Sequence, residues 1–282
     1  MKTLFALCLL LFTPPADAAK NKERDAFSRP KVSRAAPPQL KQQLMSYWAD
    51  CTNGKTTACM TLGDAYEKGH GLQQSQAYAA ALFQRACEAE DTAACYKAGM
   101  RHYKGIDGKP SKEAAVGFFE KTCTKEHLNG CNNFAMMLLA GDGATADPAR
   151  ALSIYQDTCE RNNGKACVQI AIALEQGTAV TADVERALRM YGTGCDQGSL
   201  DGCYRGGALA LSGKAGEQDF VTAVGWWERA CDQDHPSSCY ALGMLYHKGM
   251  GVRLSPDQAS DLYGKACDLG HRNACLKKQK MF

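Results

Sequence analysis

Apolar and small residues recur along this 282-residue chain with a period of 36. Each repeat can be counted from the second cysteine of a recurring pair whose members have seven residues between them. Four residues after that cysteine the chain always has glycine or alanine, ten after it glycine, twenty after it alanine, and twenty-four after it an aromatic residue. A strict period of this length is typical of proteins that stack small supersecondary repeats. We therefore predict six full repeats, at 59–94, 95–130, 131–166, 167–202, 203–238 and 239–274.

Each recurring position predicts a part of a helical hairpin. The glycine would end a first helix, because a left-handed C-cap is least costly in a residue without a Cβ. The alanine and the aromatic residue are four positions apart, so they would share one face of a second helix. Asp147-Pro148 and Ser255-Pro256 place a capping residue before proline, as at the start of a helix. No long stretch alternates with period two. The pattern therefore predicts an all-α fold, an α-solenoid of antiparallel hairpins over residues 39–282, with about 13 residues in each helix.

The cysteines of each pair lie where one predicted repeat meets the next. The pairs are Cys51 with Cys59, Cys87 with Cys95, Cys123 with Cys131, Cys159 with Cys167, Cys195 with Cys203, Cys231 with Cys239, and Cys267 with Cys275. One cysteine would end a second helix and the other would open the next first helix, so antiparallel packing predicts seven local disulfides. The alternative is pairing within a hairpin, such as Cys59 with Cys87, which would leave the two outermost cysteines unpaired. Zinc ligands usually lie two to four residues apart and in fours, so no metal site is predicted.

The N-terminal segment differs from the repeats in composition. Residues 1–18 predict a secretory signal peptide, because Lys2 precedes the apolar run Leu4–Phe12 and Ala16-Asp17-Ala18 fits a cleavage site. That apolar run is too short to span a membrane. Residues 19–38 have few large apolar side chains and predict a disordered basic linker. We therefore expect a secreted or periplasmic protein, in a compartment that favours disulfides.

Charge excludes one class of partner. The formal net charge is +3, and it is concentrated in the basic segment 19–38. The repeat region is consequently close to neutral, which argues against nucleic acid as the main partner, since that binding depends on clustered cationic charge. No cofactor is predicted.

The segment Ala241–Val252, ALGMLYHKGMGV, resembles the Sel1-like repeat, as do Leu62-Gly63, Tyr66 and Gly69–Gly71. With a cysteine pair in every repeat, the chain resembles the Helicobacter cysteine-rich proteins, a Sel1-like subgroup. The resemblance implies a right-handed superhelix with a concave groove. It also implies a link to β-lactams, since members of that subgroup are described as penicillin-binding proteins with slow β-lactamase activity. Other members of the wider family are adaptors in protein assembly.

A second stripe on the first helices predicts a binding surface. It occupies the positions one, five and eight residues after the repeat cysteine, away from the positions expected to pack. Its members are Tyr96, Met100, Tyr103, Asn132, Met136, Ile172, Tyr204, Tyr240, Met244 and His247. First helices line the concave side of stacked hairpins, and an aromatic and methionine surface suits a peptide or a small apolar ligand. The alternative is that much of this stripe is ordinary packing between repeats.

Catalytic residues are not identified. The S-x-x-K motif of serine β-lactamases occurs once, at Ser28–Lys31 in the expected linker, and K-T-G, G-x-S-x-G and H-E-x-x-H do not occur. Our first hypothesis is a non-enzymatic scaffold that binds a peptide or protein in its groove. The alternative, by resemblance, is a β-lactam-binding protein with weak β-lactamase activity, with β-lactams or peptidoglycan-like small molecules as ligands. A third is a structural spacer in the cell envelope.

Overall fold

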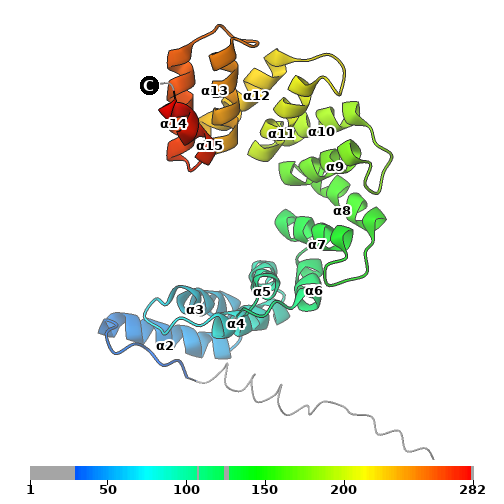
Figure 1. Cartoon of the computed structure of the whole chain (residues 1–282). Coiled ribbons are helices and arrows are strands. Elements are labelled where there is room, and N and C mark those ends of the chain that lie inside the picture. The colour runs from blue at the N-terminus through cyan, green and yellow to red at the C-terminus, as the bar shows by residue number, and fades with distance from the viewer. Residues whose placement is uncertain (1–28, 107, 124–126, 281–282) are drawn as a thin grey trace, which may run out of the picture. The chain divides into compact units, whose positions relative to one another are not determined.

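The computed structural model describes residues 29–106, 108–123 and 127–280, and its helices fall into two compact units, with the division after Thr122. We describe each unit by itself (Figure 1). The N-terminal unit holds α2 (Pro38–Thr52), α3 (Thr56–Lys68), α4 (Gln76–Glu88), α5 (Thr92–Lys104) and α6 (Lys112–Thr122). The C-terminal unit holds α7 (Leu128–Ala140), α8 (Pro148–Glu160), α9 (Gly164–Gln176), α10 (Val184–Asp196), α11 (Leu200–Ser212), α12 (Phe220–Asp232), α13 (Pro236–Lys248), α14 (Pro256–Asp268) and α15 (Arg272–Gln279).

Odd-numbered helices are the first helices of the repeats, and even-numbered helices are the second. From α3 to α14 every helix has 13 residues except α6, which has 11. Each helix pair begins three residues before the cysteine from which we counted. Within the described residues no strand forms, and extended pairing is limited to two isolated bridges. The prediction of an all-α stack of hairpins is confirmed.

The recurring positions have the roles predicted from their residue types. Five of the six glycines end a first helix in the left-handed conformation, with φ between 66° and 70°, and Gly105 ends α5 at φ 99°. The small residue lies under the aromatic ring of its own repeat. A Cβ on Gly63 would lie 2.5 Å from the Phe83 ring, and one on Gly207 would lie 2.5 Å from Trp227. The aromatic residue therefore fills the core of each hairpin only because the facing position has no large side chain.

Seven disulfides join successive repeats, and each links the two cysteines of one predicted pair. The bonds join Cys51 to Cys59, Cys87 to Cys95, Cys123 to Cys131, Cys159 to Cys167, Cys195 to Cys203, Cys231 to Cys239, and Cys267 to Cys275. The Cα atoms within each bond lie 4.1–4.9 Å apart.

The local disulfide pairing is therefore confirmed. The alternative pairing of Cys59 with Cys87 is excluded, because Cys59 is bonded to Cys51 and Cys87 to Cys95. Disulfides in this number indicate an oxidising, extracytoplasmic compartment.

The segment expected to be a linker is partly packed. Its residues from 30 to 37 lie against the α3–α4 loop, where the Ser33 N–H donates to the Gly71 carbonyl at 2.9 Å and Val32 forms a bridge with Leu72. Pro30 and Ala36 are buried there. Two small buried side chains and one backbone hydrogen bond thus hold part of the expected linker against the N-terminal unit. The expected signal peptide and residues 19–28 lie outside the described residues.

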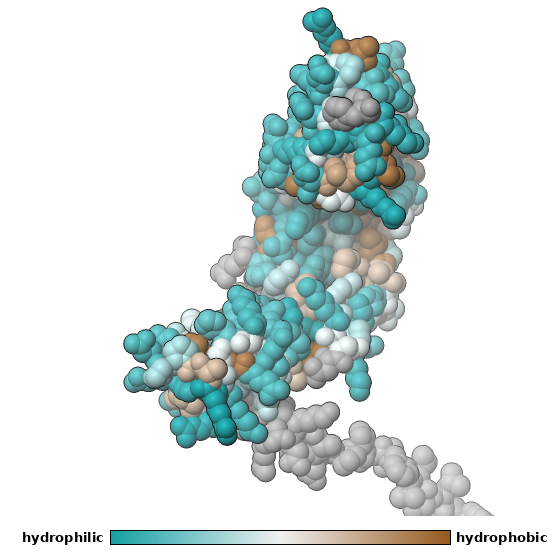
Figure 2. Space-filling model, turned by 60° about the vertical axis from the view of Figure 1, so that its left-hand side comes forward, coloured by the Kyte–Doolittle hydropathy of each residue, from teal (hydrophilic) through white to brown (hydrophobic). Residues whose placement is uncertain are grey.

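None of the described helices combines the length and the apolar character that crossing a membrane requires. Figure 2 shows a largely hydrophilic face on which apolar side chains form small, separate patches.

Candidate functional site

The stripe predicted on the first helices is divided between the two units. Tyr96, Met100 and Tyr103 lie on α5 in the N-terminal unit. The other seven members lie on α7, α9, α11 and α13 in the C-terminal unit. The structure therefore presents two sets of residues.

On α5 the tyrosines pack around one aromatic ring of their own hairpin. The rings of Tyr96 and Tyr103 lie 6.0 and 6.5 Å from the ring of Phe119, and both tyrosines are half-buried. The ammonium group of Lys112 lies 3.4 Å from the Tyr103 ring, in a cation–π arrangement. Part of each ring thus serves packing, and the remainder faces solvent.

On α11 and α13 two tyrosines at the same repeat position each meet the histidine that caps the next first helix, α13 or α15. The Tyr204 ring lies 5.4 Å from the ring of His235, and the Tyr240 ring stacks 4.4 Å from that of His271. Both histidines are helix N-caps, whose Nδ1 atoms accept hydrogen bonds from the backbone N–H of Ser238 and Ala274. The cap and the stack therefore hold each tyrosine in place.

Burial keeps the histidine cap in its neutral form. Burial lowers the pKa of His235, and the nearby carboxylate of Asp201 partly opposes this shift. An Nδ1 that accepts a hydrogen bond must be unprotonated, so the shift and the cap agree. These tyrosine–histidine pairs were not predicted from the sequence. The signal that could have revealed them is a histidine 31 residues after each tyrosine.

The other members of the C-terminal set differ in exposure. Met136 is 38% exposed and His247 is exposed, whereas Ile172 and Met244 pack partly into core clusters. The side-chain oxygen of Asn132 is buried and has no hydrogen-bond partner among the described residues. The stripe thus mixes exposed and packing residues.

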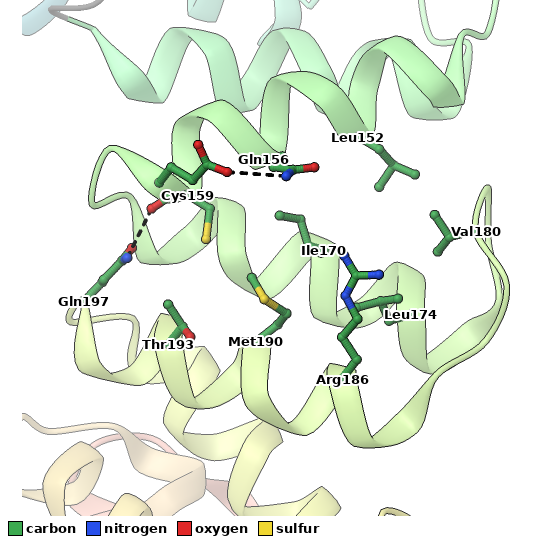
Figure 3. Close-up of a pocket in the computed structure, with 11 residues that line it drawn as sticks. Leu152, Gln156, Cys159, Ile170, Leu174, Val180, Arg186, Met190, Thr193 and Gln197 are labelled. Carbon is green, nitrogen blue, oxygen red and sulfur yellow. Dashed lines mark hydrogen bonds between the residues drawn. The ribbon is translucent and has the colours of Figure 1, made fainter.

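A cleft that the sequence did not predict opens between α8 and α10, with α9 as its floor (Figure 3). Its volume is about 320 Å³. Its apolar walls are formed by Leu152, Ile170, Leu174, Val180 and Met190. Figure 3 shows Cys159 and Gln197 at one end, and Val180 with Arg186 at the other. We call this the α8–α10 cleft.

The repeat that forms the far wall of the cleft lacks a basic side chain that several other repeats have. At the position twenty-six after the repeat cysteine, Arg85, Arg229 and Lys265 each donate a hydrogen bond to a carbonyl at the end of the preceding second helix, at 3.0, 3.2 and 2.7 Å. In the repeat 167–202 this position is Thr193, which is too short to do so. Gln197 takes over part of the task, because its Nε2 donates to the Cys159 carbonyl at 3.1 Å.

The equivalent place one repeat later is filled; we call it the α10–α12 groove. There Trp226 on α12 covers Gly192 and Gly206, since a Cβ on either would come within 3.0 Å of the indole. In the α8–α10 cleft, Met190 stands at the position of Trp226 and Ile170 at that of Gly206. Met190 is smaller than Trp226 and does not cover this place as the indole covers the glycines, so the cleft stays open.

The described residues include no cluster of metal-ligating side chains. The S-x-x-K motif begins at Ser28, which lies outside the described residues, so the β-lactamase alternative gains no site from the structure.

The repeats match a known family model. The Sel1 repeat model matches residues 56–91, 92–127, 129–163, 164–199, 201–235 and 236–271, which is more than half of the chain. Among proteins with curated descriptions none matches.

Solved structures show a similar fold. A protective antigen present in uropathogenic Escherichia coli strains is 23% identical over 83% of this chain, with a TM-score of 0.70, and this chain covers 50% of its length. A Sel1 repeat protein from Oxalobacter formigenes is 18% identical over 79% of this chain and 96% of its own, with a TM-score of 0.65. Helicobacter pylori cysteine rich protein B is 25% identical over 46% of this chain and 93% of its own, with a TM-score of 0.38, and no function is inferred from it. The six repeat matches show that the chain belongs to the Sel1 repeat family.

Proposed function

We propose that this Sel1 repeat protein is a non-enzymatic scaffold that binds a polypeptide segment along the first helices of its C-terminal unit. It would act outside the cytoplasm, as a secreted or periplasmic protein. Its seven disulfides support this location, because disulfides persist in oxidising compartments.

The observation that carries the proposal is the pair of anchored tyrosines. Tyr204 and Tyr240 are half-buried, and each ring is held by the histidine that caps the next first helix. Rings that are already ordered lose little conformational entropy when a ligand binds, so they can contribute more of their contact energy to affinity. Tyrosine is also enriched among the residues that dominate binding energy at protein interfaces.

The chemistry of the surrounding surface fits a peptide. Among the described residues neither tyrosine hydroxyl has a hydrogen-bond partner, so each can bond to a ligand's backbone or side chains. Met244 and His247 lie on the same helix as Tyr240, and flexible methionine side chains adapt to varied apolar ligands. An apolar surface with a few hydrogen-bonding groups is typical of grooves that bind peptides.

Selection from a random peptide library displayed on phage tests the proposal. The oxidised protein should enrich a peptide family with apolar anchors, and a synthetic member should bind in fluorescence polarisation. Combining Tyr204→Ala with Tyr240→Ala should weaken that binding at least tenfold, which corresponds to a loss of about 1.4 kcal/mol.

Val221→Ala is the matched control, since Val221 is 80% exposed on the second helix α12, away from the stripe. It should leave peptide affinity unchanged. If no peptide family is enriched, or if the double tyrosine variant binds as well as the unaltered protein, the proposal is wrong.

A further inference from the structure

The α8–α10 cleft has the size and lining of a small-molecule site. Its volume of about 320 Å³ is at the lower end of the range for ligand pockets, which are mostly apolar and carry a few polar groups that fix orientation. It lies between second helices, whereas the stripe of the proposed function lies on first helices, so the two sites are independent.

One end of the cleft is cationic. Arg186 lines the cleft and extends from α10 toward Ile170 (Figure 3). Within the described part of the chain Arg186 has no ion-pair partner. The equivalent residue of the preceding repeat, Arg150, lies 5.0 Å above the ring of Phe134. In the cleft that ring is replaced by Ile170, so the guanidinium of Arg186 stands over an apolar floor with its hydrogen-bond donors available.

The other end is acidic. Glu160 lines the cleft beside Cys159, and its carboxylate accepts a hydrogen bond from Gln156 at 3.3 Å. The equivalent residue of the next repeat, Asp196, is paired with Arg229 at 2.9 Å. Thr193 replaces that arginine, and among the residues that the structure describes Glu160 has no ion-pair partner, so its charge repels a second anion. The charges therefore orient an anionic ligand with its carboxylate at Arg186.

We propose that the α8–α10 cleft binds a small carboxylic acid with an apolar body, whose carboxylate pairs with Arg186 and whose body lies between Met190 and Leu174. A guanidinium recognises a carboxylate through two parallel hydrogen bonds. A monocarboxylate is preferred to a dicarboxylate because the far end of the cleft is acidic.

The test compares two probes on the oxidised full-length protein, 4-phenylbutyrate and its neutral amide. Isothermal titration and saturation-transfer NMR should give a dissociation constant of about 1 mM for the acid, as expected for a ligand of about twelve heavy atoms. The amide should bind about fivefold more weakly, the most that a solvent-accessible ion pair usually contributes.

Three variants locate the site. Met190→Trp places in the cleft the side chain that fills the α10–α12 groove, and it should abolish binding of both probes. Arg186→Gln should remove the preference for the acid over the amide. Arg150→Gln, the matched change one repeat earlier, should alter neither affinity.

Circular dichroism and thermal unfolding check that each variant is folded. If Met190→Trp fails to fold, Thr193→Arg replaces it, because an arginine there should occupy the cleft as Arg229 occupies the next repeat. Lack of saturable binding by the unaltered protein overturns the proposal. So does undiminished binding by the filled variant, or a preference for the acid that persists in Arg186→Gln.

Discussion

The α8–α10 cleft and the α10–α12 groove occupy equivalent places in successive repeats, yet the first is open and the second is filled. Their frames are the same, with helices of 13 residues and a disulfide at each junction. The difference comes from a few side chains, chiefly Met190 and Thr193 in one and Trp226 and Arg229 in the other. The recurring positions therefore build the fold, and the positions that vary between repeats decide where a cavity forms.

The largest expected change in the free energy of unfolding comes from emptying the α10–α12 groove. Trp226→Ala should lower the free energy of unfolding by about 3 kcal/mol, at the low end for tryptophan because the side chain is only half-buried. Met190→Ala should cost about 1 kcal/mol, since the space around Met190 is already open. Urea unfolding followed by circular dichroism measures both. Equal losses of unfolding free energy in Trp226→Ala and Met190→Ala would show that the cleft and the groove are packed alike, which would contradict the difference described above.

Removing the disulfide beside the cleft and removing the one beside the groove should lower the free energy of unfolding equally. Replacing both cysteines of a pair by serine, either Cys159 and Cys167 or Cys195 and Cys203, should lower the free energy of unfolding by about 2.5 kcal/mol. This is the chain-entropy value for so short a loop. The same urea titrations measure it. A difference larger than about 1 kcal/mol between the two variants would mean that the shared frame itself differs between repeats.

The basic side chain should have a smaller effect. Arg229→Ala should cost about 1 kcal/mol, because it removes one exposed ion pair and one hydrogen bond to the Asp196 carbonyl. Thr193→Arg should recover less than this in the cleft. Raising the salt concentration should reduce the loss in Arg229→Ala by screening the ion pair. A loss that does not depend on salt would show that the ion pair with Asp196 contributes nothing to the stability.

The smallest expected effect is a pH dependence that differs between two caps. Burial lowers the pKa of His235, which caps α13, whereas Ser199 caps α11 and does not titrate in this range. The contribution of His235 is therefore complete above its unfolded pKa of about 6.5 and is lost as the pH falls through its lower folded pKa. His235→Asn keeps a capping side chain and should lessen the decline in stability between about pH 6.5 and 5.

Thermal unfolding across that range tests the difference between His235→Asn and the unaltered protein. His102 also has a pKa lowered by burial, and it remains in both proteins, so its contribution cancels. An unchanged pH profile in His235→Asn would show that this histidine contributes no pH dependence.

The fold could be predicted from the sequence because its determinants recur. Gly69 and its equivalents end the first helices, and the ring of Phe83 packs against Gly63 in a pattern repeated six times. The disulfide pairing could be predicted because antiparallel helices bring the two ends of each junction together. A period of 36 residues repeats each of these signals, which makes them readable.

The α8–α10 cleft could not be predicted in this way, since it depends on departures from the period. Thr193 is conspicuous only once the hydrogen bonds of Arg85, Arg229 and Lys265 are known. Likewise, the segment before α2 looked like a linker because its contacts are few, namely two small buried side chains, the Val32–Leu72 bridge and one backbone hydrogen bond from Ser33. Tertiary contacts between unlike side chains leave no periodic trace in one sequence.

The short spacing of the disulfides has a consequence for how the chain matures. Both cysteines of each bond, such as Cys87 and Cys95, are eight residues apart, so they can meet by closing one short loop. A wrong partner, such as Cys59 for Cys87, would have to close a loop of 28 residues, which costs about 1 kcal/mol more in entropy. The nearest thiol is thus the correct one at every step. The seven bonds can therefore form one after another along the chain, without a later reshuffling.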